Sequence, residues 1–147
     1  MFVIFKEIFI KKQIINNKMR KEVENWWKQA KRDLQTANNS LNSGDYYASA
    51  FWSQQAVEKS LKAVFLIVKN VHPSPSHSLI YLASEIDLDK KYFQFLRELT
   101  PAYINTRYPD IADALPSEIY DEVKAADLFK KAKEILLWLE KKYQKKQ

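Results

Sequence analysis

The sequence predicts an all-α fold, an antiparallel up-and-down bundle of four to five helices. Two long stretches repeat apolar residues at alternating spacings of three and four, which is the spacing of one helix face. The chain has a single glycine among 147 residues, so it lacks the tight positive-φ turns on which sandwiches and barrels depend. At this length, with 46% hydrophobic residues, one domain with one core is expected.

The first helix is expected over about 19–43, where the helical spacing is clearest. Its apolar stripe consists of Val23, Trp27, Ala30, Leu34, Ala37 and Leu41. Gly44 follows, and we expect it in the left-handed conformation that ends many helices. Asp45 is expected to cap the next helix with its side chain. So short a turn predicts an antiparallel helix pair.

The second helix, over about 45–69, is apolar on a wider arc, which predicts a central position in the bundle. Gln54, Gln55 and Glu58 lie beside this arc, where polar groups are costly to bury without partners. They indicate either a buried hydrogen-bond network that holds the helices in register or a contact with a ligand or partner.

Shorter helices are expected after the proline-rich loop 72–76. Ser76 is expected to cap a helix over about 77–86, and another helix follows over about 90–99. Pro101 is placed to open a further turn. An irregular region then extends to residue 116. The last helix is expected over about 117–143, with an apolar stripe of Ala125, Phe129, Ala132, Leu136, Leu139 and Tyr143.

The formal net charge of +6 resides at the two ends of the chain. Residues 1–18 and 141–147 are lysine-rich, whereas the body between them is nearly neutral, unlike a dedicated nucleic-acid binder. We expect a helical domain over 19–143 and a basic tail over 144–147. Residues 1–18 are expected to form a loosely attached N-terminal extension or, alternatively, an element that packs on a partner.

Several kinds of chemistry are excluded by composition. The absence of cysteine rules out disulfides, thiolate zinc sites and cysteine nucleophiles. The two histidines, His72 and His77, predict no metal site, and the lack of a glycine-rich phosphate loop leaves no cofactor to expect. No stretch reaches 18 apolar residues, so no helix is expected to span a membrane. We therefore expect a cytoplasmic protein without a membrane partner.

Arg107 is the most informative single residue, because it lies in a short turn between Tyr103 and Tyr108. Its planar guanidinium can bind a phosphate or carboxylate, or stack on an aromatic ring. Alternatively, it satisfies carbonyl groups at a helix C-terminus or pairs with Asp110.

Three segments resemble the successive signatures of the HEPN domain family: Gln55–Ala63, His77–Leu79 and Tyr103–Asp110. The resemblance covers about residues 19–143. It implies an antiparallel bundle of four or five helices, often homodimeric and similar to the helical domain of aminoglycoside nucleotidyltransferases. Members of the family frequently work beside a small nucleotidyltransferase, and many are toxins that cleave RNA.

This chain departs from the ribonuclease members, in which an arginine is followed four to six residues later by a histidine. None of its four arginines has a histidine at that distance, so RNA is the less expected partner. The chain resembles the branch with Arg-Tyr-Pro, here residues 107–109, for which nucleotide binding or complex formation is the usual suggestion.

The sequence thus leads to three functional hypotheses. The first is a non-catalytic homodimeric module that binds a nucleotide or a small nucleotidyltransferase partner, as in two-component toxin–antitoxin systems. Four tryptophans and sixteen phenylalanines and tyrosines favour a dimer, because exposed aromatic patches usually mark interfaces. The alternatives are a ribonuclease in which folding brings His77 to Arg107, and a structural dimer without a ligand. The candidate contacts are Arg107, Tyr108, Asp110, Tyr103, Gln55, Glu58, Lys62 and His77.

Overall fold

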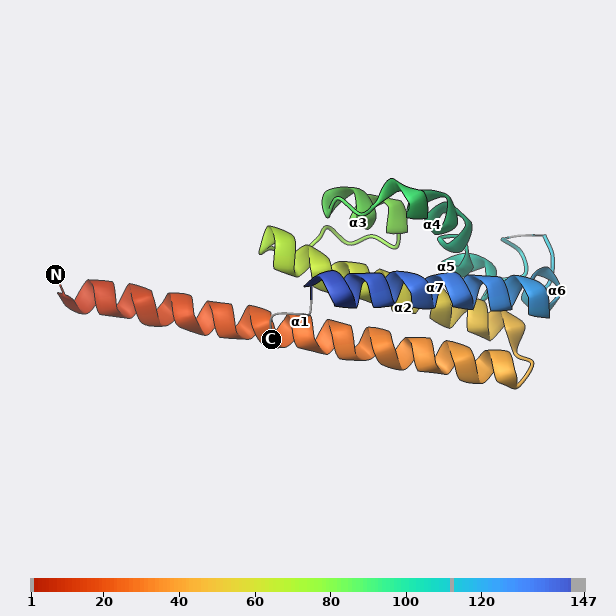
Figure 1. The fold of residues 1–147 in the computed structure, drawn as a ribbon, viewed down its shortest axis with the longest axis horizontal. Coiled ribbons are helices and arrows are strands. Elements are labelled where there is room, and N and C mark those ends of the chain that lie inside the picture. Colours follow the sequence, from red (N-terminus) through yellow and green to blue (C-terminus); the bar gives the residue numbers. More distant parts are fainter. Residues whose placement is uncertain (1, 112, 144–147) are drawn as a thin grey trace.

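The computed structural model describes residues 2–111 and 113–143, and its long helices form the bundle that the sequence predicts (Figure 1). These are α1 (Phe2–Asn42), α2 (Tyr46–Lys69) and α7 (Glu122–Tyr143). Between α2 and α7 lie the short α3 (Leu79–Glu85), the 3₁₀ turn η1 (Lys90–Tyr92), α4 (Phe93–Leu99), α5 (Ala102–Asn105) and α6 (Pro116–Ile119). No strand occurs in these two ranges, so the all-α fold class is confirmed.

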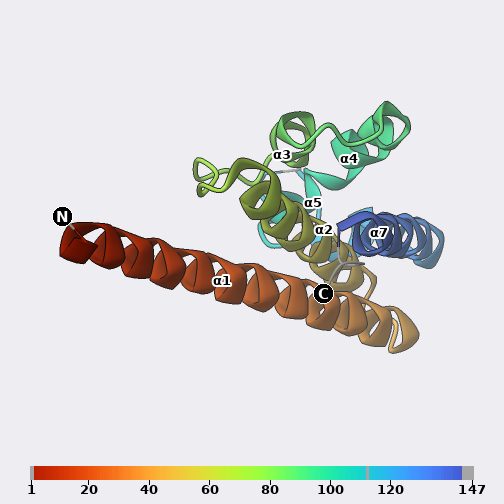
Figure 2. The same ribbon diagram turned by 60° about the vertical axis from the view of Figure 1, so that its left-hand side comes forward.

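Helix α2 is the central element, as its wide apolar arc predicts. It packs against α1 and α7, and α3 and α5 cover another side of it (Figures 1 and 2). Its side chains Val57, Leu61 and Val64 are fully buried. They form one core with Leu82, Leu96, Ile135 and Leu139 from the surrounding helices.

The turn between α1 and α2 depends on Gly44, whose φ of 83° confirms the expected left-handed conformation. The Gly44 N–H donates to the carbonyl of Leu41 (3.2 Å), and the Asp45 N–H donates to that of Ser40 (2.9 Å), which is the Schellman pattern of helix ends. The expected capping by Asp45 is wrong. Its carboxylate makes no cap bond to α2 and instead accepts a hydrogen bond from the Ser43 hydroxyl (3.1 Å).

The start of α3 also differs from the prediction. The Ser78 hydroxyl, not that of Ser76, caps α3 by accepting from the Tyr81 N–H (3.3 Å). Ser76 accepts from the Ser78 N–H (3.0 Å) and so shapes the preceding loop. As a result His77 lies in the loop before α3 rather than in the helix.

The two following helices are subdivided relative to their predicted bounds. The helix expected over 90–99 opens as the 3₁₀ turn η1 before α4 begins. The last helix was expected from residue 117, but Tyr120 has an extended conformation (φ −109°, ψ 108°) that separates α6 from α7. The Asp121 carboxylate accepts from the Lys124 N–H (2.8 Å), so this acidic residue starts a new helix.

The N-terminal segment is a continuation of α1, which begins at Phe2 rather than near Met19. Every side chain from residue 2 to residue 18 is exposed. Figure 1 shows this part of the helix projecting beyond the end of the bundle. The expected basic tail, 144–147, lies outside the described residues.

Candidate functional site

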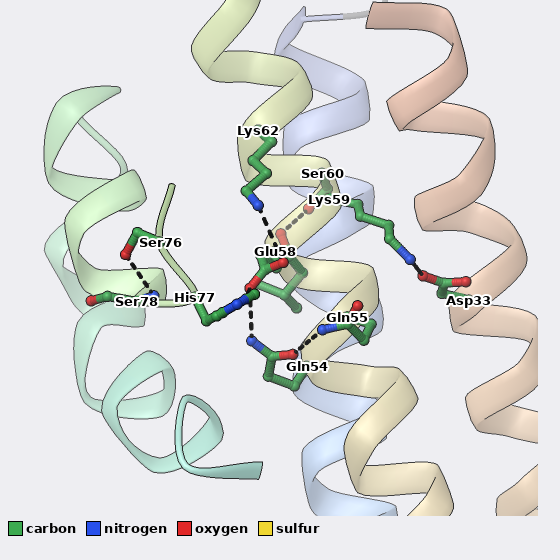
Figure 3. A network of polar contacts seen from close by, with 11 residues as sticks. Asp33, Gln54, Gln55, Glu58, Lys59, Ser60, Lys62, Ser76, His77 and Ser78 are labelled. Atoms are coloured by element: carbon green, nitrogen blue, oxygen red, sulfur yellow. Dashed lines mark hydrogen bonds and ion pairs between the residues drawn. The ribbon is translucent and has the colours of Figure 1, made fainter. Parts of the chain in front are cut away.

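A buried carboxylate, Glu58 of α2, organises the polar part of the candidate site (Figure 3). Its Oε1 lies 3.0 Å from Nδ1 of His77 and accepts from Nε2 of Gln54 at 3.3 Å. Its Oε2 accepts from Nζ of Lys62 at 3.4 Å. Gln55 joins through Gln54, since its Nε2 donates to the Gln54 Oε1 at 2.8 Å. The structure therefore forms the hydrogen-bond network that is one of the two predicted interpretations of these residues, and His77 extends it to the surface.

The ring of Tyr103 in α5 joins His77 to Arg107. The His77 and Tyr103 rings are stacked, with centroids 3.6 Å apart and planes inclined by 16°. Cζ of Arg107 lies 4.2 Å from the Tyr103 ring centroid, a cation–π distance. The two residues whose proximity the ribonuclease hypothesis requires thus contact the same ring.

Arg107 combines two of the roles that the sequence left open. Its Nε donates to the carbonyl of Tyr103 at 2.8 Å, which satisfies a group at the C-terminal end of α5, and its guanidinium stacks on the ring of the same residue. The salt bridges within the described ranges do not include a pair between Arg107 and Asp110. Arg107 remains exposed to solvent.

Two further aromatic rings surround this arginine. Its Cζ lies 5.4 Å from the Tyr108 ring centroid and 5.6 Å from that of Phe51. Phe51 was not among the sequence candidates. Its spacing would have found it, because Phe51, Gln55, Glu58 and Lys62 follow one another at intervals of four, three and four along one face of α2.

A cleft of about 320 Å³ adjoins these side chains. This volume is at the lower end of the range of small-molecule sites. The cleft is lined by His77, Ser78, Thr100, Pro101, Tyr103 and Ile104, together with Asn105 and Ile111. The structure thus joins all the sequence candidates except Asp110, which is exposed in the loop after α5.

The architecture and the site lie within one family domain. The model of the HEPN domain matches residues 23–142. The chain belongs to the HEPN family. It is similar over 82% of its length to TT1696 from Thermus thermophilus, with 30% identity, a TM-score of 0.74 and 97% of that chain covered. It is likewise similar to ST0689, an archaeal HEPN homologue, with 32% identity, a TM-score of 0.69 and coverage of 82% and 96%. No curated protein matches this chain.

A second polar cluster of this HEPN domain links α1 to α2 and was missing from the sequence candidates. The Asp33 carboxylate is 1% exposed, accepts from Nε2 of Gln29 at 2.8 Å and forms an ion pair with Lys59 (Figure 3). The Asp33–Lys59 pair joins α1 to α2. Asp33 does not line the cleft.

A wider groove of about 440 Å³ lies between α4 and α7 of the HEPN bundle. Its charged residues alternate in sign: Lys91, Glu98, Lys131 and Glu134. The Lys131 ammonium donates a hydrogen bond to the Asp127 carboxylate (3.0 Å), and this bond raises the pKa of Lys131. These charges balance and are solvated, so the smaller cleft, whose lining residue Tyr103 contacts Arg107, is the better candidate for an anionic ligand.

Neither metal binding nor membrane crossing finds support in the described part of the HEPN chain. Its His, Asp and Glu side chains form no group of three or more that could hold a metal ion. None of its helices is both long and apolar enough to cross a bilayer.

Proposed function

We propose that this HEPN domain is a non-catalytic module that binds a nucleotide in the cleft beside Arg107. The observation that carries the proposal is the exposed guanidinium of Arg107, which is held against the ring of Tyr103, a residue that also lines that cleft. In this arrangement the arginine binds phosphate, and the cleft walls formed by Tyr103 and Ile104 contact the base.

The electrostatics of the site support an anionic ligand. Lys62 neutralises Glu58, and Lys59 neutralises Asp33, so neither carboxylate is left to repel a phosphate. Arg107 has no acidic partner among the described salt bridges. Its planar group suits bidentate phosphate binding, and the bond from its Nε to the Tyr103 carbonyl fixes its orientation before the ligand arrives.

Calorimetric titration with ATP, AMP and inorganic phosphate tests this function. Replacing Arg107 by Gln is expected to weaken ATP binding by about tenfold or more, because a charged hydrogen bond is lost. Arg107→Lys should keep only part of the affinity, since its ammonium is a point charge and lacks the planar fork that binds phosphate bidentately. The matched control is Arg97→Gln, an exposed arginine of α4. Equal affinities of wild type and the Arg107 variants for every nucleotide would show that the site is assigned wrongly.

The partner in this proposal is a second copy of the chain or a small nucleotidyltransferase. Large apolar side chains are exposed on α5 and along the loop that follows it, and they are suited to a protein contact: Ile104, Tyr108, Ile111 and Leu115. We would isolate the tagged protein from its own cells and identify stoichiometric companions by mass spectrometry. A small nucleotidyltransferase would support the two-component system, and a homodimer alone would favour direct nucleotide binding.

Ribonuclease activity is the second candidate, favoured by the contact of His77 and Arg107 with one ring. Incubation of the purified protein with total RNA decides between the two. Cleavage that disappears in His77→Ala would establish the nuclease, whereas intact RNA would discard it. If neither nucleotide nor RNA raises the melting temperature, the domain is a structural dimer without such a ligand, because a ligand that prefers the native state must raise it.

A further inference from the structure

The projecting part of α1 has the most extensive exposed apolar surface among the described residues. Each of its large apolar side chains is at least 46% exposed: Phe2, Val3, Ile4, Phe5, Ile8, Phe9, Ile10, Ile14 and Ile15. A helix of this length without packing is only marginally stable in water, and contiguous apolar patches of this kind mark interaction sites.

This surface is not needed to complete the HEPN bundle. The match to the family model begins at residue 23. The two solved relatives are covered over 97% and 96% of their own chains, yet they account for only 82% of this one. The bundle core therefore closes without residues 2–18, and their apolar side chains are available for a contact outside it.

One row of side chains along α1 has three apolar residues in the projecting part and three basic residues along the bundle, and Glu7 borders it. Six residues of α1 follow one another at intervals of seven, four, seven, seven and four, and this spacing places them in one row on a helix. This row, the outer face, consists of Val3, Ile10, Ile14, Lys21, Lys28 and Arg32, and all six are exposed. Val23, Trp27 and Ala30 are buried on the other side of α1, where the rest of the molecule lies (Figures 1 and 2). Among the described residues, none covers the outer face between Val3 and Arg32.

The charge of α1 identifies the partner of this face. The helix has nine lysines and arginines against four acidic residues, so it carries +5 of the formal net charge of +6. A second α1 packed along the same face would oppose these charges with its own. An anionic surface complements them, and lysine side chains can extend to its headgroups while their stems cover apolar atoms.

We propose that the outer face of α1 lies on an anionic phospholipid bilayer. Val3, Ile10 and Ile14 enter the interfacial region, and Lys21, Lys28 and Arg32 contact the headgroups, as in helices that lie in the plane of a membrane. The bundle and its cleft then face away from the lipid. A helix that lies on a bilayer differs from the expectation of no membrane partner. That expectation considered only segments that span a membrane, and not a helix face with both apolar and basic residues.

Sedimentation of the full chain with phosphatidylcholine vesicles, with and without phosphatidylglycerol, tests the proposal. Binding is expected only to the anionic vesicles and should decrease with salt. Ile10→Gln/Ile14→Gln keeps charge and helix propensity but removes apolar contact, and should weaken binding by about tenfold or more. Lys21→Gln/Lys28→Gln/Arg32→Gln should weaken it by about a hundredfold.

Two matched controls test the face and the charge separately. Phe5→Gln/Ile8→Gln changes the other side of the same segment, since Phe5 lies about five turns before the buried Val23. Lys90→Gln/Lys91→Gln/Arg97→Gln removes three charges from η1 and α4, across the bundle from α1 (Figure 2). Both should bind anionic vesicles like wild type, with unchanged circular dichroism.

Three results would overturn the proposal. The first is no binding to anionic vesicles, and the second is wild-type binding by either outer-face variant. The third is a protein contact instead: Phe5→Gln/Ile8→Gln converts a dimer to a monomer by light scattering, while the outer-face variants behave as wild type. Nucleotide affinity is measured on the same samples, so failure here is distinguishable from failure of the proposed function.

Discussion

Asp33 and Lys59 form an ion pair in which the carboxylate is nearly inaccessible to solvent. The Asp33 side chain is 2% exposed and that of Lys59 is 18% exposed. Removing the lysine leaves a buried charge that only Gln29 contacts, and breaking such a pair usually costs about 3–5 kcal/mol. We therefore expect Lys59→Met to lower the free energy of unfolding by about this amount, measured by urea denaturation.

Lys31→Met is the control for this prediction, because Lys31 pairs with Glu140 at the surface (2.7 Å). An exposed pair contributes about 0–1 kcal/mol. Equal losses in the two variants would show that burial of Asp33 does not determine the energy of its pair.

Ser53 illustrates the opposite case, a buried polar atom without a partner. Within the described residues its hydroxyl accepts and donates no hydrogen bond. Ser53→Ala is expected to leave the stability unchanged or to raise it by up to about 1–3 kcal/mol, because the desolvation penalty disappears. Thermal unfolding measures the change.

The comparison for Ser53 is Ser60→Ala on the same helix, since the Ser60 hydroxyl donates to the carbonyl of Val57 at 2.8 Å. This variant should lose about 1 kcal/mol. A larger loss at Ser53 than at Ser60 would mean that the Ser53 hydroxyl has a partner after all.

At the scale of elements, the reversal between α1 and α2 depends on one backbone conformation. A Cβ added at Gly44 would meet nothing within 4 Å, so only the positive φ opposes a side chain there. We expect Gly44→Ala to destabilise the protein by about 1–2 kcal/mol and Gly44→Asn by less, because asparagine tolerates this region. Chemical denaturation of the two variants gives the order, and equal losses would contradict the backbone explanation.

The long elements could be predicted from sequence, but several of their ends could not. Periodicity over many residues located α1, α2 and α7, because each must bury a stripe against the others. Caps were predicted less well, since Asp45, Ser76 and Ser78 all offer suitable oxygens. The choice among them depends on local backbone geometry that residue types do not specify.

At the scale of the whole molecule, stability should decrease at high pH because of Tyr120. Burial raises the pKa of this phenol above its ordinary value of 10.0. The unfolded chain therefore releases the proton first as the pH rises, so the free energy of unfolding falls from about pH 10 upward. Tyr120→Phe should show a smaller decrease than wild type in urea denaturation between about pH 9 and 11.

Tyr108→Phe provides the control for this pH dependence, because Tyr108 is 49% exposed. Its pH profile should match that of wild type. A profile of Tyr120→Phe that coincides with both would show that Tyr120 ionises equally in the folded and unfolded chains.

The residues of the candidate site could be predicted from the sequence, but their arrangement in space could not. Residue chemistry singled out Glu58, His77, Tyr103 and Arg107 one by one. Their meeting depends on the loop before α3, which returns His77 to α2, and on α5, which places Tyr103 over it. Such long-range placement has no local signal. The Asp33–Lys59 pair was missed for the same reason, since 26 positions separate its members.

The continuity of α1 also has a mechanical consequence. At 41 residues the helix is about 60 Å long, and its C-terminal half is fixed to α2 through buried side chains such as Trp27 and Ala37. No linker separates the two halves. A partner bound to the N-terminal end of α1 therefore fixes the orientation of the entire bundle. A rotation of that end also changes the direction in which the cleft opens.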